Sequence, residues 1–336
     1  METREISKIG VTFSEYSSDD YDGFVNCIDG FYHGGYPYKQ YLDKEYLDKK
    51  TKDGSMIVTV AKNASGKIVG TSAAQKLNGV FSGSVLLLLR CVDKSCRGIG
   101  IGSRQELYLF ELISKKFGDA LSLYADVMTH DAISQGTLCR RGFSLCGIRM
   151  MLYKNEIMVP ALRFPENTKM SQAIYCKAVG KKDIKINVPD ELECFIKSIY
   201  DDLRVNADFA KKIGKTAEKG VYDWSDKPTH SSAEFYIVVS GKDFEKEFLP
   251  LIESKISEGY TAVAYINAEK SGAVDVYEKL KENGFYFSGI KPLSENGEYI
   301  VMSHSKACKN VFENIILPAE KEYFLEKIIG GMNYES

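Results

Sequence analysis

Residues 84–117 constrain the possible folds of this chain more than any other segment. They begin with an apolar run, residues 85–89, in which polar and apolar side chains do not alternate. Such a run indicates a strand that is covered on both faces. A glycine-rich stretch follows at residues 97–102, and apolar residues then recur at spacings of three and four up to Phe117, which predicts a helix. This order predicts an α/β fold with a site at the loop.

The loop has the properties of an anion-binding site. Gly98, Gly100 and Gly102 stand at alternate positions, and glycine lets the backbone approach a ligand closely. The free N–H groups of the first helical turn and the helix dipole attract negative charge. Arg97 adds a full positive charge at the mouth of the loop. The predicted ligand is a diphosphate.

Three kinds of diphosphate loop can be compared with these residues. A P-loop would end in Gly-Lys-Ser/Thr, which is absent here. A dinucleotide loop requires G-x-G-x-x-G, but the third glycine comes one residue early and Ser103 stands in its place. The third comparison matches: Arg97-x-x-Gly100-x-Gly102, preceded by Val92, resembles the R/Q-x-x-G-x-G/A motif of the GNAT superfamily of N-acetyltransferases.

This resemblance implies that the ligand is acetyl-CoA and that the protein is an N-acetyltransferase. It places the acetyl and pantetheine groups on the backbone at Cys91 and Val92. It assigns the diphosphate to the loop amides, which belong to Gly98, Ile99, Gly100, Ile101, Gly102 and Ser103. Acetyl transfer to an amine requires positioning, a base for the ammonium proton and an acid for the leaving thiolate. The acceptor stays open among small amines, amino acids, peptide N-termini and lysine.

The chain departs from the family at the expected acid. Many GNAT enzymes have a tyrosine four residues before a Gly-Phe pair, and this chain has Leu138 there. His130, at the end of a predicted strand, is our candidate acid or base because its ordinary pKa suits proton transfer. Ser134, in the following helix, is our candidate hydrogen-bond donor to the thiolate. A surface histidine and a helix-capping serine are the simpler interpretations. The missing tyrosine leaves a non-catalytic acyl-CoA-binding or regulatory protein as the alternative function.

The segment between Phe31 and Tyr46 is unusually rich in aromatic residues. Four further tyrosines lie between these two positions: Tyr32, Tyr36, Tyr38 and Tyr41. Core packing explains such a cluster, and so does a partly open surface, since charged residues are interleaved with the rings. In GNAT proteins this region covers the acceptor site, and both interpretations stay open.

A short pattern repeats in the two halves of the chain. The residues G-F-x-x-x-G-I occur at 142–148 and at 284–290, followed by Arg149 and Lys291. A predicted strand and helix precede both copies, which indicates a tandem duplication. We therefore expect an α/β fold of two tandem GNAT-like domains, each a mixed sheet flanked by helices. The expected domains are residues 1–156 and 171–336, the second with a C-terminal helix, joined by a linker at 157–170.

The second domain is expected to be degenerate. Its strand and helix meet at Ser240-Gly241-Lys242-Asp243, a short junction with one glycine. Asp243 is expected to cap the helix and so to occupy the N–H groups that a phosphate needs. We therefore predict no CoA site in this half.

Composition excludes several other classes of protein. The formal net charge is -2, which gives no basic surface for nucleic acid. The apolar runs are too short to span a membrane. The eight cysteines form no C-x-x-C pair, so neither a zinc site nor a disulfide framework is indicated. A cytoplasmic location with reduced thiols is expected. The oligomeric state is not predicted.

Overall fold

The computed structural model describes residues 4–6, 10–36, 38–154, 168–211, 213–305, 312 and 315–330. These residues form two compact units. The first unit contains the described residues of Met1–Leu77 and Val85–Ala120, and the second contains those of Asn78–Ser84, Leu121–Asn155 and Pro165–Ser336. Strands and helices make up both units, and the fold is α/β as predicted.

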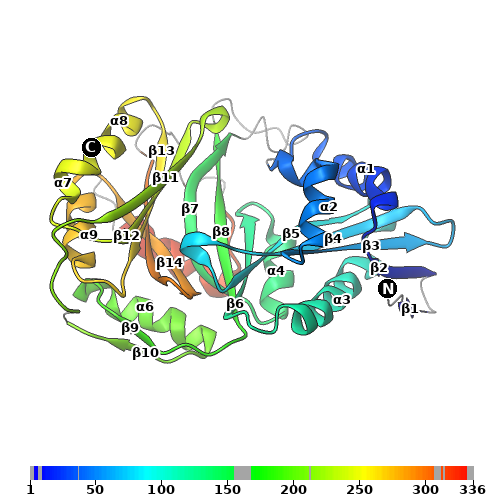
Figure 1. Ribbon diagram of the computed structural model, residues 1–336, viewed down its shortest axis with the longest axis horizontal. Helices are drawn as coiled ribbons and strands as arrows, with labels where there is room; N and C mark the ends of the chain where they lie inside the picture. Colours follow the sequence, from blue (N-terminus) through cyan, green and yellow to red (C-terminus); the bar gives the residue numbers. More distant parts are fainter. Residues whose placement is uncertain are drawn as a thin grey trace. The chain divides into compact units, whose positions relative to one another are not determined.

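The first unit is an antiparallel sheet in the order β1-β2-β3-β4-β5. Its strands are β1 (Arg4–Ile6), β2 (Val11–Glu15), β3 (Met56–Asn63), β4 (Ile68–Lys76) and β5 (Ser84–Val92). The helices α1 (Tyr21–Tyr32) and α2 (Lys44–Lys52) cover one face, and α3 (Ile101–Lys116) covers the other (Figure 1). Short 3-10 turns lie at η1 (Ser18–Asp20), η2 (Lys39–Leu42) and η4 (Lys94–Cys96).

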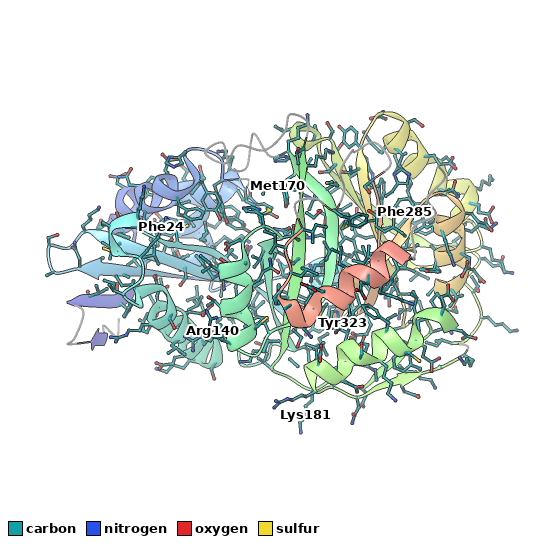
Figure 2. All side chains as sticks on the ribbon, turned by 180° about the vertical axis from the view of Figure 1, so that it is seen from behind. Phe24, Arg140, Met170, Lys181, Phe285 and Tyr323 are labelled. Carbon is teal, nitrogen blue, oxygen red and sulfur yellow. The ribbon has the colours of Figure 1, made fainter. Side chains whose placement is uncertain are left out.

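Apolar packing on both faces fixes this sheet between its helices. Phe24 and Ile28 of α1 are fully buried; Phe24 is labelled in Figure 2. On the opposite face, Leu109 of α3 is fully buried and Ile113 nearly so. Because both faces are covered, consecutive residues of β3 are buried instead of alternate ones.

A bulge interrupts β5 near its C-terminal end. Thr71 of β4 lies opposite Cys91, whereas Ala73 lies opposite Leu88, so β5 has one residue more than β4 over this stretch. Leu89 has a φ of 56°, in the left-handed region. Its carbonyl oxygen accepts a hydrogen bond of 2.7 Å from Thr71 Oγ1. A bulge redirects backbone groups away from the ladder, and here it does so just before the glycine-rich loop.

The second unit contains a larger, mixed sheet in the order β6-β8-β7-β14-β15-β13-β12-β11. All neighbouring strands are antiparallel except β12 and β13, which are parallel. The strands are β6 (Ser122–Met128), β7 (Ser144–Lys154), β8 (Lys169–Ala178), β11 (Val221–Lys227), β12 (Ser232–Val239), β13 (Thr261–Asn267), β14 (Tyr286–Ser294) and β15 (Gly297–His304). A separate parallel pair is formed by β9 (Ile184–Ile186) and β10 (Ala207–Phe209).

Helices pack on this sheet through aromatic contacts. They are α4 (Ala132–Arg140), α6 (Asp190–Leu203), α7 (Phe244–Glu247), α8 (Leu249–Ser257), α9 (Ala273–Glu282) and α10 (Glu322–Gly330), with 3-10 turns η3 (Gly79–Phe81), η5 (Pro228–His230) and η6 (Ala319–Lys321). Phe195 of α6 contacts Phe287 of β14 at a ring distance of 5.8 Å and Tyr323 of α10 at 6.0 Å. Figure 2 shows α10, with Tyr323 labelled, beside α6.

The two copies of the repeated pattern have the same topology. In β6-α4-β7-β8 the last strand lies between the first two, and β13-α9-β14-β15 repeats this arrangement. The copies meet where Gly147 of β7 lies opposite Gly289 of β14. A Cβ on Gly289 would lie 2.2 Å from the Cα of Gly147, so this close approach requires glycine. Four residues beyond each glycine the backbone turns left-handed, at Met151 and Leu293.

The compact units do not coincide with the domain boundaries expected from the sequence. β6, α4 and β7 precede residue 156, but they group with the second unit because β8 pairs with both β6 and β7. The expected linker, 157–170, lies outside the described residues except for its last three, and Met170 already belongs to β8 (Figure 2). This grouping does not test whether the halves are separate domains, and the expected division stays a prediction.

Candidate functional site

The glycine-rich loop connects β5 to an uncapped helix. α3 begins at Ile101, and its N-cap residue Gly100 provides no side chain to cap it. The Arg104 amide donates a 3.2 Å hydrogen bond to the Gly100 carbonyl, and the Ile101 and Gly102 amides precede this first bond of the helical ladder. α3 is described over its whole length, and its first turn contains no acidic residue. This helix start therefore favours an anion.

The backbone of the loop depends on glycine at two positions. Gly98 and Gly100 have φ values of 80° and 87°, in the left-handed region. A Cβ at either position would meet no atom within 4 Å, so conformation rather than crowding requires glycine there. Gly102 is helical, and a Cβ on it would lie 3.2 Å from Val92 Cγ2. Gly102 thus lets α3 start close to the end of β5.

Asp93 organises the first turn of the loop. Its carboxylate accepts hydrogen bonds from the Ser95 amide and hydroxyl, at 2.9 and 2.7 Å, and pairs with the Lys67 ammonium at 2.8 Å. These hydrogen bonds, the one from Lys67 above all, hold the pKa of Asp93 well below its ordinary value. The charge of Asp93 is therefore partly compensated by Lys67, which weakens its repulsion of an anion at the loop.

Arg97 is held against the end of β5. Its Nε donates a 3.0 Å hydrogen bond to the Val92 carbonyl, and its guanidinium lies 5.1 Å from the ring centre of Phe31. The side chain is exposed, and the contacts with β5 and α1 fix its position beside the loop. Arg97 can therefore present its terminal N–H groups to an anion with little loss of side-chain freedom.

Two polar contacts anchor α3 to the sheet. Arg90 of β5 pairs with Glu106 of α3 at 2.8 Å. Gln105 Nε2 donates a 3.1 Å hydrogen bond to the Thr59 carbonyl of β3. Both Gln105 and Glu106 are buried. The start of α3 is thus fixed relative to the end of β5, which a preformed ligand site requires.

Cys91 offers its backbone rather than its thiol. The side chain is 3% exposed, and burial raises the pKa of the thiol to about 12. A protonated thiol is a poor nucleophile. Beyond it, Val92 is half-buried. The residues predicted to bind CoA, which are Cys91, Val92 and 97–103, all lie in the first unit.

A cavity of about 400 Å³ lies beside the start of this loop. It is lined in part by Asp19, Asp20, Lys67 and Asp93. Three carboxylates and one ammonium make it unsuited to a phosphate group, because like charges repel. Within the described residues, no three His, Cys, Asp or Glu side chains gather as a metal site would require.

The predicted catalytic residues, His130 and Ser134, belong to the second unit. His130 lies between β6 and α4, and burial lowers the pKa of its imidazole. The Ser134 hydroxyl donates a 2.5 Å hydrogen bond to Asp131, and its amide donates one of 2.9 Å to the same carboxylate. Ser134 thus takes part in capping α4. Leu138 is fully buried in the core.

The aromatic segment forms a chain of edge-to-face contacts in the first unit. Tyr32, Tyr36, Tyr38, Tyr41 and Tyr46 contact one another in that order at ring distances between 4.9 and 6.1 Å. Tyr36 and Tyr41 are buried, and the other three are half-buried. The sequence pattern identified this cluster, but no local signal distinguished the buried rings from the partly open ones.

The corresponding junction in the second half is filled by the chain itself. Asp243 does not cap α7, contrary to expectation. Its carboxylate accepts hydrogen bonds of 2.8 Å from the Gly220 amide and from the Tyr222 hydroxyl. A Cβ on Gly241 would lie 2.1 Å from the Gly220 nitrogen. The segment before β11 therefore packs where the first half has an open loop, and sequence alone gave no sign of it.

Comparisons with known proteins give matches among solved structures. No protein-family model matches the chain, and no curated protein matches it. The ribosomal-protein-alanine N-acetyltransferase from Brucella melitensis is 18% identical, with a TM-score of 0.40 over 49% of this chain and 98% of its own. The ribosomal-protein-S5-alanine acetyltransferase from Vibrio fischeri is 14% identical, with a TM-score of 0.42 over 53% of this chain and 97% of its own. The ribosomal-protein-S18-alanine N-acetyltransferase from Escherichia coli is 15% identical, with a TM-score of 0.38 over 51% of this chain and 96% of its own.

None of the helices in the described part of the chain is long and apolar enough to cross a lipid bilayer.

Proposed function

We propose that this chain is a GNAT-type enzyme that transfers an acetyl group from acetyl-CoA to an amine of a small molecule or peptide. The uncapped start of α3 carries the proposal. There, Gly98 and Gly100 adopt left-handed conformations, the first turn is free of acidic residues, and Arg97 lies at the mouth. This geometry agrees with the sequence motif that pointed to a CoA diphosphate.

The residues of the first unit fit the parts of acetyl-CoA. The amides from Gly98 to Ser103 and the Arg97 guanidinium would hold the diphosphate. The backbone at Cys91 and Val92, just beyond the bulge at Leu89, would hold the acetyl and pantetheine groups. Acetyl-CoA itself would supply an activated acetyl group.

His130 is proposed to accept the proton of the attacking amine. Burial lowers the pKa of its imidazole, which keeps the ring neutral at neutral pH and suits a base better than an acid. Ser134 is proposed as a donor to the leaving sulfur, although its hydroxyl would first have to give up the bond to Asp131. Leu138 has no group that could take either part.

The second half is proposed to be a degenerate copy that binds no CoA. The matching strand order and the paired Gly147 and Gly289 support duplication. The packing of Gly220 against Gly241, with Asp243 bonded to Gly220, supports the absence of a diphosphate site.

Calorimetric titration with CoA, followed by a turnover assay, tests the proposal. We expect one CoA per chain and no binding of NAD(P)H. Incubation with acetyl-CoA and a library of amines should release free thiol with at least one acceptor. Binding without turnover on any amine or peptide would favour the non-catalytic alternative, and the absence of CoA binding would overturn the proposal. Two CoA molecules per chain would contradict the assignment of the second half.

A further inference from the structure

The side chain of Gln135 joins α4 to three other segments of the second unit, namely the end of β6, β8 and the segment before η6. It is fully buried. Its Nε2 atom donates hydrogen bonds of 3.0 Å to the Thr129 carbonyl and 2.8 Å to the Ile316 carbonyl. Its Oε1 atom accepts one of 3.1 Å from the Tyr175 hydroxyl. The amide therefore uses both its donor and its acceptor groups, and a buried network that is satisfied in this way is rigid.

These contacts hold the backbone on both sides of His130. Thr129, directly before it, is buried, and its carbonyl also accepts a 3.0 Å hydrogen bond from the Ile316 amide. The Thr129 amide donates a 3.1 Å hydrogen bond to the Ser171 carbonyl of β8. Directly after His130, Asp131 caps α4 with its carboxylate. Because a fixed backbone limits the rotamers of a side chain, the direction of the His130 imidazole is restricted.

Ile316 brings the second half of the chain to this place. It follows β15 in the sequence, yet its amide and its carbonyl both bond at the end of β6, to Thr129 and Gln135. Its side chain is 51% exposed. The segment is therefore held here through its backbone rather than through the apolar side chain of Ile316.

The repeated pattern provides a comparison within the chain. His130 and Gln135 lie twelve and seven residues before the Gly-Phe pair of their copy, and Gly272 and Tyr277 lie at the same distances before the pair of the second copy. The second copy reaches the same strand order with neither an imidazole nor an amide at these positions. Histidine and glutamine thus occur together at these positions only in the copy that contains the glycine-rich loop.

We propose that Gln135 and the backbone of Ile316 position His130 for proton transfer, so that a segment of the second half holds the candidate base of the first half in place. The inference rests on the proposed function, in which His130 accepts the proton of the amine. Gln135 acts through His130 and is a positioning residue. Since a shift of about 1 Å in a catalytic group can lower the rate about a hundredfold, releasing these contacts should reduce turnover. The loop proposed to bind CoA belongs to the first unit and should keep its affinity.

A double-mutant cycle tests this role, with an amine acceptor that supports turnover of the wild type. Gln135→Met keeps the length of the side chain and removes its amide. It should lower kcat about tenfold to a hundredfold and leave the calorimetric affinity for CoA unchanged. In the His130→Ala background the same substitution should change kcat less than about twofold, because the group that Gln135 positions is gone. Equal losses in both backgrounds, or an unchanged kcat in Gln135→Met, would overturn the inference and leave the proposed function intact.

Ile316→Pro tests the same contact from the other side and serves if Gln135→Met does not fold. Proline lacks the N–H group that bonds to Thr129, so kcat should fall in the wild-type background and not in His130→Ala. Ala319→Pro is the matched control. It places a proline in the same segment at the first position of η6, where proline is tolerated, and should leave kcat unchanged. Equal kcat values for Ile316→Pro and Ala319→Pro would contradict the role of Ile316. A wild type without turnover on any amine would remove the proposed function, and this inference with it.

Discussion

At the scale of single residues, Gly100 is the position in the loop with the strongest requirement for glycine. Its φ of 87° costs a residue with a Cβ about 1–2 kcal/mol. Gly100→Val should therefore lower stability by that amount and also abolish CoA binding, because the loop amides would no longer converge. Gly54→Val is the matched control: Gly54 has a φ of 74° and equally open surroundings, at the end of α2. It should lose similar stability and keep CoA affinity. Equal CoA titrations for Gly100→Val and the wild type would show that the loop is wrongly assigned.

Arg97 should contribute less to CoA affinity than the glycines do. It offers one exposed charge, and such contacts are worth up to about 1 kcal/mol. Arg97→Ala should weaken CoA binding severalfold, and added salt should reduce its difference from the wild type because salt screens exposed charges. Calorimetry at two ionic strengths measures both effects. Since Arg97 also contacts Val92 and Phe31, a loss that salt does not change would point to a structural role.

His130 should affect turnover far more than CoA binding. A base contributes roughly a hundredfold or more to the rate, and it does so in the transition state. His130→Ala should depress kcat by that factor and leave CoA affinity unchanged. Because burial lowers the pKa of His130, the wild-type rate should rise with pH through a value below the ordinary 6.5. The rate of the His130→Ala variant should not show this rise with pH. The same pH profile in both proteins would remove His130 from the mechanism.

At the scale of elements, sequence reasoning worked best where hydrophobic pattern and turn residues agreed. The run at residues 85–89 and the periodicity up to Phe117 located β5 and α3 within a few residues of their ends. Strand β11, by contrast, was missed. It is an edge strand in which charged residues are frequent and Val221 and Trp224 are exposed, so it has no apolar face to reveal it. The predicted helix after Asp243 is broken at Phe248, beside Pro250.

Pairing between distant strands was also beyond local reasoning. β8 begins at the end of the expected linker, yet it pairs with β6 and β7, which precede that linker in the chain. No local pattern at residues 169–178 indicates these partners. The candidate site divides in the same way. The motif identified the loop from Arg97 to Gly102, whereas the burial of Tyr36 and Tyr41 within the aromatic segment depends on what packs around them.

The junction between β12 and α7 leads to a prediction about this pair of elements. Asp243 holds the segment before β11 through its bonds to Gly220 and Tyr222. Asp243→Ala should lower the unfolding temperature, because both donors lose their partner. It should not create a second CoA site, since Gly220 would still pack on Gly241. Lys242→Ala, which removes an exposed ion pair with Glu218, is the control. It should change neither the unfolding temperature nor the number of CoA molecules bound per chain. Calorimetry showing two CoA per chain in Asp243→Ala would make the carboxylate, rather than the packing, the reason for degeneracy.

At the scale of the whole molecule, the duplicated pattern places two buried cations in equivalent positions. Arg149 and Lys291 each follow the Gly-Ile of their copy. Arg149 forms ion pairs with Asp126 and with Glu234. Lys291 instead lies over the ring of Phe81, 3.8 Å from its centre, and 5.0 Å from that of Tyr124. The same place in the repeat therefore holds a compensated charge in one copy and an aromatic environment in the other.

This difference predicts how stability depends on pH. Burial lowers the pKa of Lys291 to about 8 from 10.5, with Asp126 and Glu234 opposing the shift and Arg149 adding to it. Between pH 8 and pH 10.5 the unfolded chain binds more protons than the folded one, so the free energy of unfolding rises with pH over this range. Below pH 8 the whole penalty applies, about 3 kcal/mol for a shift of this size. Lys291→Met removes the charge and keeps apolar contact with Phe81.

Lys291→Met should therefore raise the free energy of unfolding by up to about 3 kcal/mol at pH 7, with a smaller gain at pH 10, where the wild-type lysine is neutral in the folded state. Urea unfolding of the full chain at the two pH values measures this. Arg149→Met is the matched control at the equivalent position. It should destabilise the protein by about 3–5 kcal/mol, because it leaves the half-buried Asp126 without its ion pair and takes from the buried Glu234 one of its two cations, the other being Lys227. If Lys291→Met also destabilised the protein at pH 7, the contact with Phe81 would outweigh the cost of burying the ammonium, and the lysine would be a stabilising element of the duplicated fold.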